Sequence, residues 1–243
     1  MSYPKPRGRD VDLVANFVRR YELDSLISPD LLEALTPLRR MPGEFIIGSG
    51  EPVRSLFFLV EGRAKAYRVL ENGQSILAAF FGPLDVLGEV ELFSSPRYAL
   101  SVVALEESVC LALPVEAVKK AAERNSRLFM YLCARLGEKL DDRNLAESIN
   151  LRYPVENRLA SYLLASMDGE GSILGTDDLG ELADFIGASY RQLGRVVRRF
   201  RGEGILEKAR GRIRVLDRAK LAPYARDLYL GTECRIRPEA FGP

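Results

Sequence analysis

Residues 182–200, LADFIGASYRQLGRVVRRF, contain two short stretches with helical spacing on either side of a glycine. The pattern predicts two helices joined by a tight turn at Gly187, because glycine takes the positive φ of such a turn without strain. Small Ala183 lets the helices cross closely. These features predict a helix-turn-helix, although a plain helical hairpin would show a similar pattern. The apolar residues expected in the shared core are Leu182, Ile186, Leu193 and Val196.

The outer face of the second predicted helix carries side chains suited to nucleic acid. Ser189 is a natural N-cap, and polar residues fill the first two turns after it. Arginine can bond both major-groove acceptors of guanine, and glutamine can pair with adenine. The last two arginines are better placed for phosphates, which add affinity but little sequence information. The predicted DNA-binding residues are Ser189, Tyr190, Arg191, Gln192, Arg195, Arg198 and Arg199.

A basic hairpin follows this helix pair. The strands are expected at Ile205–Lys208 and Arg212–Leu216, with a turn at Arg210 and Gly211. Residues 187–220 hold eleven Lys or Arg residues and three acids, whereas the whole chain has a net charge of only +1. A basic block on an otherwise acidic protein favours a polyanion partner, and a hairpin in this position predicts a wing. Double-stranded DNA is the predicted partner.

Composition excludes several other classes. The chain has 243 residues, no histidine and three cysteines, which are Cys110, Cys133 and Cys234. The usual general base and the commonest metal ligand are therefore absent, and we expect neither an enzyme nor a metal site. The start of the chain is no secretory signal and no apolar run is long enough to span a membrane, so we expect a cytoplasmic protein with no membrane partner.

The spacing of apolar residues divides the chain into three parts. Residues 10–38 have the spacing of short helices, residues 41–113 hold apolar runs broken by glycine and proline, and the pattern after Pro114 is helical. An Asn72-Gly73 turn is expected between two of the strands. The expected divisions are N-terminal helices at 1–40, a β-roll sensor at 41–114, a long dimerisation helix at 115–152, a winged helix-turn-helix at 153–222 and a tail at 223–243. Leu132, Leu136 and Leu140 are the expected dimer interface.

The chain resembles the CRP/FNR family of bacterial transcription regulators over nearly its whole length, and within it the YeiL-like branch. The resemblance rests on MPGEFIIGSGEP, LFFLVEGRAKAY, VLGEVELF, SVVALEES, ENRLASYLL and GASYRQLGRVVRRF. It implies an α+β chain with an N-terminal double-stranded β-helix of the cyclic-nucleotide-binding type, a jelly roll, then a long dimerisation helix and a C-terminal winged helix. It also implies that Ser189, Tyr190, Arg191 and Arg195 occupy DNA-contacting positions.

The sensing half departs from the family pattern. Gly88 and Glu89 match the family's Gly-Glu step, but Tyr98 stands where an arginine grips the cyclic phosphate, and Arg97 lies one residue early. On a strand, a slip of one residue reverses the direction of a side chain, which disfavours cyclic nucleotide as the effector. Arg143 and Asn144 fall where the family's type member contacts adenine. The resemblance therefore places an effector pocket at these six residues and leaves the effector unknown.

Other sensors known in the family are also disfavoured. A haem ligated by histidine is excluded, and the N-terminal cysteine group of a [4Fe–4S] sensor is missing. Cys110 and Cys133 are candidates for a redox switch, although their apolar surroundings favour plain burial. The predicted protein is a homodimer that binds a two-fold operator, acts with RNA polymerase and responds to an effector or redox change at the β-roll. The alternatives are a regulator responsive to cAMP or cGMP, and a ligand-binding or protein-interaction module that does not bind DNA.

Overall fold

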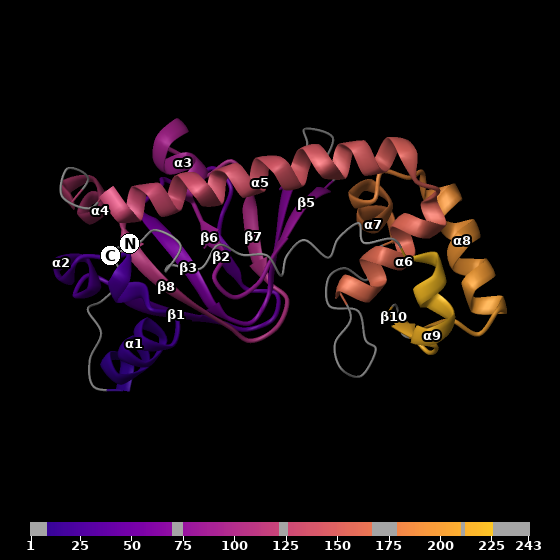
Figure 1. The fold of residues 1–243 in the computed structure, drawn as a ribbon, viewed down its shortest axis with the longest axis horizontal. Helices are drawn as coiled ribbons and strands as arrows, with labels where there is room; N and C mark the ends of the chain where they lie inside the picture. Colours follow the sequence, from indigo (N-terminus) through magenta and orange to yellow (C-terminus); the bar gives the residue numbers. More distant parts are fainter. Residues whose placement is uncertain (1–8, 70–74, 122–125, 167–178, 210–211, 226–243) are drawn as a thin grey trace. The chain divides into compact units, whose positions relative to one another are not determined.

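The apolar runs of the first half form two antiparallel sheets (Figure 1). The computed structural model describes residues 9–69, 75–121, 126–166, 179–209 and 212–225. In one sheet the strand order is β1 (Thr36–Arg40), β8 (Ser108–Pro114), β3 (Ser55–Glu61) and β6 (Val86–Leu87). In the other it is β2 (Phe45–Ile47), β7 (Ser101–Ala104), β4 (Ala64–Val69) and β5 (Ser75–Phe81). The predicted β-roll is confirmed, and the expected Asn72-Gly73 turn lies outside the described residues.

The burial of strand β3 on both faces explains why its sequence is apolar without alternation. Every residue from Ser55 to Val60 is buried, because both faces of its sheet are covered. Phe57 and Leu59 point into the space between the two sheets, in a cluster with Tyr98 and Cys110. The alternate residues Leu56, Phe58 and Val60 contact the helices on the outer face, in a second cluster. The first half therefore has one core inside the roll and another beneath its helices.

The helices of the first half are α1 (Arg9–Arg20), the short 3-10 turn Leu23–Ser25, α2 (Pro29–Leu32), α3 (Glu89–Ser94) and α4 (Val115–Ala121). The expectation that the N-terminal helices reach residue 38 is wrong, because Thr36–Arg40 is strand β1. Thr36 pairs with Ala112 and Leu38 pairs with Cys110 of strand β8. Pro37 is tolerated there because β1 is an edge strand, where a missing N–H breaks no ladder.

A helix of 27 residues, α5 (Ser126–Arg152), follows the roll. The stretch predicted as one helix at 115–152 thus contains two described helices, α4 and α5. Helix α5 ends directly before Tyr153 and Pro154, as expected from the bias of a residue preceding proline against helical backbone. The chain divides into two units within this helix, and Lys139 is the last α5 residue of the first unit. Side chains are described as far as Asp141.

The second unit contains the remaining elements, which we describe separately from the first. They are α6 (Val155–Ser166), α7 (Leu179–Phe185), α8 (Tyr190–Gly202), β9 (Leu206–Ala209), β10 (Arg212–Val215), α9 (Arg218–Leu221) and a final 3-10 turn at Ala222–Tyr224. Strands β9 and β10 pair antiparallel in the register Leu206 to Val215. The predicted hairpin is therefore present, and its turn at residues 210–211 lies outside the described residues. Helix pair and hairpin together form a winged helix-turn-helix.

Candidate DNA interface and effector pocket

Helices α7 and α8 have the packing expected of a helix-turn-helix. Leu182, Ile186 and Leu193 are fully buried. Gly187 has a φ of +64°, which confirms the reason for glycine in the turn. The prediction for the fourth core residue is wrong. Val196 is only half-buried, whereas the next residue, Val197, is buried.

The first turn of α8 is held by a capping box. The backbone N–H of Gln192 donates to Ser189 Oγ at 3.3 Å, and the backbone N–H of Ser189 donates to Gln192 Oε1 at 3.0 Å. Two N–H groups that the helix leaves unpaired are thereby satisfied. Ser189 and Gln192 were both predicted to contact DNA, but the structure uses their side-chain oxygens to begin the helix.

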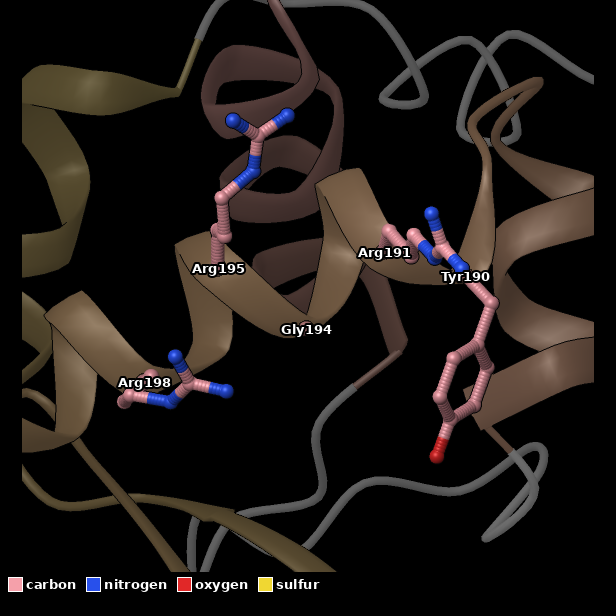
Figure 2. Close-up of a pocket in the computed structure, with 5 residues that line it drawn as sticks. All are labelled: Tyr190, Arg191, Gly194, Arg195 and Arg198. Carbon is pink, nitrogen blue, oxygen red and sulfur yellow. The ribbon is translucent and has the colours of Figure 1, made fainter.

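Four of the predicted DNA-binding residues surround a hollow on the outer face of α8. The hollow has a volume of about 530 Å³, and Gly194 forms part of its wall (Figure 2). In the described part of the chain, the arginines among its lining residues have no acidic partner, so their positive charge is available to a ligand. The lining side chains are Tyr190, Arg191, Arg195 and Arg198.

Arg199 is engaged within the chain instead. Its Nη2 donates to Glu156 Oε2 of α6 at 2.7 Å, and its Nε lies 3.7 Å from Glu203 Oε1. The guanidinium also lies over the ring of Tyr224, 5.6 Å from the centroid. The hydrogen bond with Glu156 raises the pKa of Arg199 above its usual value. These contacts tie α8 to α6, in a place where the sequence predicted a phosphate contact.

A second arginine, which sequence reasoning missed, supports the turn. Arg158 of α6 is buried and its Nη1 donates to the carbonyl oxygens of Ile186 and of Gly187, the latter at 2.8 Å. Carbonyls at the end of a helix lack partners within it, and a cation there also suits the helix dipole. Arg158 thus fixes the turn between α7 and α8. Its separation of nearly thirty residues from these carbonyls left no local signal in the sequence.

In the first unit, Tyr98 occupies the expected effector pocket. Its hydroxyl donates to the Ser55 carbonyl at 2.6 Å and accepts from the Ser55 N–H at 3.3 Å. A Cβ added to Gly88 would lie 3.1 Å from Tyr98 Cε1, so the ring packs directly on Gly88. Arg97 is exposed and its Nη1 donates to the carbonyl of Gly50 at 2.7 Å. The ring, not the guanidinium, is the side chain directed toward Gly88.

Glu89 also has a partner from this chain. Its carboxylate is almost completely buried and accepts a hydrogen bond from Lys139 Nζ of α5. Lys139 also donates to the Val86 carbonyl at 2.7 Å and lies 5.0 Å from the centroid of the Phe81 ring. The negative charge of Glu89 is therefore balanced by Lys139 of the same chain. The two pocket residues expected on α5, Arg143 and Asn144, lie where side chains are not described.

A second ion pair attaches α5 to the same part of the roll. Arg135 Nη2 lies 3.0 Å from Asp85 Oδ1, and both side chains are buried. Arg135 also bonds Glu138 one turn along, and Asp85 Oδ2 accepts the Gly82 N–H at 2.7 Å. These hydrogen bonds satisfy charges that would otherwise be costly to bury. Sequence analysis missed Arg135, Asp85 and Lys139, because each partner lies about fifty residues away.

The expected dimer residues on α5 differ in burial. Leu132 is fully buried in the core beneath the helices, so it is not available to a partner, contrary to expectation. Leu136 is half-buried, and Leu140 is 60% exposed. Met130 is 58% exposed, and a Cβ added to Gly137 would have no atom within 4 Å. An open face of α5 therefore exists, but it is offset from the predicted stripe.

The two redox candidates lie in opposite surroundings. Cys110 is completely buried between the sheets, and burial raises the pKa of its thiol to about 12. Cys133 lies exposed on α5. Both thiols are free in the structure, and Cys234 lies outside the described residues. No cluster of three or more metal-ligating side chains occurs in the described ranges, nor does any helix there have the length and apolar character needed to cross a membrane.

A β-roll followed by a winged helix-turn-helix defines a class, the DNA-binding transcription regulators with an N-terminal sensor fold. Comparison with known families agrees: the cyclic nucleotide-binding domain matches residues 38–125, and the Crp-like helix-turn-helix domain matches residues 157–224. The chain belongs to the CRP/FNR family of transcription regulators.

Individual relatives support this assignment. The chain is 30% identical over 185 residues to regulatory protein YeiL of Escherichia coli O157:H7, which covers 76% of this chain and 83% of the relative. It is 22% identical to transcriptional activator protein anr of Pseudomonas aeruginosa, over 84% of each chain. Among solved structures, FixK2 from Bradyrhizobium japonicum has a TM-score of 0.61 and 22% identity, covering 79% of this chain and 98% of that one. The CRP-family regulator TTHB099 from Thermus thermophilus has a TM-score of 0.63 and 24% identity, covering 77% and 95%.

Proposed function

We propose that this regulator binds a specific duplex through the face of α8 that holds the hollow. The observation that carries the proposal is the group of three exposed arginines, Arg191, Arg195 and Arg198, which have no acidic partner among the described residues. Arg191 and Arg195 lie in the first two turns, where a recognition helix contacts base edges, and Arg198 follows one turn later. Tyr190 lies beside them and is 62% exposed. The first two arginines select bases and Arg198 contacts a phosphate.

The remaining residues predicted to contact DNA have supporting tasks in this proposal. Ser189 and Gln192 begin the helix, and Arg199 fastens it to α6. Their geometry keeps the three free arginines at fixed positions on one rigid element. Precise placement of this kind raises specificity, because a base contact depends on side chains held close to their bonding geometry.

The functional unit is a homodimer that pairs through the open face of α5. Met130, Cys133, Gly137 and Leu140 follow one another at intervals of three or four residues, so they share a face of the helix. The bulky members of that face are exposed in the single chain, and Gly137 leaves room for the close approach of a second helix. A two-fold dimer presents two α8 helices to half-sites about 34 Å apart.

The β-roll does not use a cyclic nucleotide as its effector. Tyr98 fills the space next to Gly88, and Lys139 neutralises the buried Glu89. A cyclic phosphate would need a cation where the ring now lies. In this proposal the regulator binds DNA without cAMP or cGMP, and any effector acts elsewhere on the roll or on α5.

A selection experiment followed by titration tests the DNA interface. The wild-type chain is used to select duplexes from a randomised pool, and dissociation constants are then measured on the selected duplex and on mixed-sequence DNA. Arg191→Ala and Arg195→Ala are expected to weaken binding to the selected duplex about 5- to 150-fold, and to weaken binding to mixed DNA much less, because a bidentate contact discriminates by about 1–3 kcal/mol.

Arg19→Ala on α1 is the matched control. It removes an exposed arginine of the same charge from a helix outside the interface, and should change neither constant more than twofold. Equal losses on both DNAs for Arg191→Ala and Arg195→Ala would contradict base recognition. Failure of the wild-type chain to enrich any duplex, together with binding that is insensitive to salt, would overturn DNA recognition by α8 altogether.

A further inference from the structure

Gly194 stands in the interior of α8, where glycine is a poor choice for stability. The helix runs from Tyr190 to Gly202, and Gly194 has no positive φ that would require glycine. A Cβ added there would meet no atom within 4 Å, so packing within the chain does not require glycine either. Alanine would stabilise the helix by reducing the freedom of the unfolded chain. Neither the backbone nor the neighbouring side chains therefore account for this residue.

The surroundings of Gly194 point to a ligand that comes close to the helix backbone. Gly194 forms part of the wall of the hollow, and the longer side chains of Tyr190, Arg191, Arg195 and Arg198 surround it (Figure 2). Tyr190, Arg191 and Arg198 are three or four residues from Gly194 and so lie on its face of the helix. The guanidinium groups supply charge at the rim. Elsewhere the lining is carbon, supplied by the glycine Cα and the alkyl stems of the arginines.

This inference rests on the proposed function, in which this face of α8 enters the major groove. The chemical groups of the groove then limit what can contact Gly194. Base pairs display hydrogen-bond donors and acceptors there, and the 5-methyl group of thymine is the only apolar group among them. Donors and acceptors suit the arginines, whereas the carbon lining around Gly194 suits the methyl group.

We infer that Gly194 is a specificity-determining residue that admits a thymine 5-methyl group to the backbone of α8. The methyl group packs on the Gly194 Cα, beside the bases that Arg191 and Arg195 contact. A larger residue at position 194 would occupy the space that the methyl group needs. Glycine at this position makes the helix less stable, and in the bound complex the thymine methyl group fills the space that a side chain would take.

The inference is tested by removing single methyl groups from the DNA and by adding one to the protein at position 194. In one half-site of the selected duplex, each thymine is replaced in turn by uracil, which removes only the 5-methyl group. The dissociation constant is measured for the wild-type chain and for Gly194→Ala. With the wild-type chain, one replacement should weaken binding about fourfold, which corresponds to the transfer of one buried methyl group. Gly194→Ala should weaken binding to the thymine duplex about tenfold, since overpacking at an interface is destabilising.

At that same position, Gly194→Ala should bind the uracil duplex more tightly than the thymine duplex, because the added methyl group takes the place of the missing one. Gly202→Ala is the matched control: Gly202 lies in α8, also has no atom within 4 Å of an added Cβ, and does not line the hollow. It should bind both duplexes within twofold of the wild-type chain. Thermal unfolding of Gly194→Ala at or above the wild-type temperature shows that folding does not cause the loss.

The possible outcomes separate this inference from the proposed function. If the wild-type chain selects no duplex, both are overturned. If the arginine variants behave as proposed but Gly194→Ala binds like the wild-type chain, only the role of Gly194 is overturned. If Gly194→Ala weakens binding equally at every thymine and uracil, the glycine sets the distance of approach and the thymine contact is wrong. A reversed preference at one position supports the inference.

Discussion

Arg199 of α8 donates a hydrogen bond to Glu156 of α6 across 2.7 Å, between Nη2 and Oε2. Arg198, the preceding residue, lines the hollow on a different face of the same helix and has no acidic partner in the described ranges. Adjacent residues of a helix point about 100° apart, so two neighbouring arginines can serve different purposes. One supports the position of α8, and the other is available to a duplex.

This difference predicts opposite effects for two adjacent substitutions. Arg199→Ala should lower the free energy of unfolding by about 0.2–1 kcal/mol, the range of an exposed ion pair, and leave the salt slope of DNA binding unchanged, because Arg199 contacts no phosphate in the proposed complex. Arg198→Ala should leave stability unchanged, weaken binding to all duplexes and reduce the salt slope by about one. Thermal unfolding and fluorescence titration at several salt concentrations measure the two effects. The reverse pattern would show that Arg199 contacts the phosphate.

Tyr98 provides a second prediction, for the interior of the roll. Tyr98→Phe removes the hydroxyl that bonds both backbone groups of Ser55 and leaves the ring in place. The buried N–H and carbonyl of Ser55 then lose a partner, and we expect the free energy of unfolding to fall by about 1–3 kcal/mol. Tyr67→Phe on β4 is the control, since its half-buried side chain should contribute little. Urea denaturation measures both, and equal effects would refute a special role for the Tyr98 hydroxyl.

Titration with cyclic nucleotide gives a third prediction. The wild-type chain should show no saturable heat with cAMP or cGMP, because the Tyr98 ring packs on Gly88 and Lys139 pairs with the buried carboxylate of Glu89. Calorimetry at high protein concentration measures this directly. Micromolar binding that is lost in Arg97→Ala would make Arg97 the phosphate ligand, and would contradict the assignment of the pocket to Tyr98.

The buried ion pair between Arg135 and Asp85 gives a fourth prediction. Asp85→Asn removes one of the two carboxylates that pair with the buried guanidinium of Arg135, while Glu138 remains, and we expect a loss of about 1–3 kcal/mol in the free energy of unfolding. Glu116→Gln, which removes one partner of the exposed pair with Lys119, should lose less than about 0.5 kcal/mol. Urea denaturation compares the two. Similar losses would show that burial of the Arg135 pair has no energetic consequence.

Local patterns in the sequence predicted the fold well where neighbours decide it. The N-cap at Ser189, the turn at Gly187 and the alternation of strands and turns depend on residues close together, and the structure confirms them. The local pattern of Thr36–Arg40 does not predict a strand, because only its pairing with β8, about seventy residues away, makes it one.

The predicted dimer stripe failed for a geometric reason. Residues four apart on a helix are rotated by about 40° from one another, so Leu132 lies about 80° from Leu140, on the side of α5 that packs into the core. Leu132 consequently lies in the core and Leu140 lies in the open. The ion pairs of Lys139 and Arg135 are not predictable from the sequence for a different reason. Their carboxylate partners lie in distant parts of the chain, and no periodic pattern indicates such a pair.

The sequence also left the two redox candidates undecided, and burial distinguishes them. Cys110 is fully enclosed between the sheets, whereas Cys133 is exposed on α5. Treatment of the folded chain with iodoacetamide at pH 8 should modify Cys133 and spare Cys110. Mass spectrometry of the digested protein identifies the modified residue, and unfolding in urea should render both reactive. Modification of Cys110 in the folded chain would contradict its enclosure.

Burial of Cys110 finally predicts how stability changes at high pH. Desolvation raises the pKa of this thiol from 9.0 to about 12, and the charge of Arg40 opposes the shift only in part. The unfolded chain therefore loses this proton near pH 9 while the folded chain retains it, so the stabilisation is complete below pH 9 and is lost as the pH rises toward 12. The free energy of unfolding of the wild-type chain, minus that of Cys110→Ala, should fall by up to about 1.4 kcal/mol per pH unit above pH 9. Urea denaturation at pH 8, 9 and 10 measures this difference, and a constant value across the series would show that the thiol titrates equally in both states.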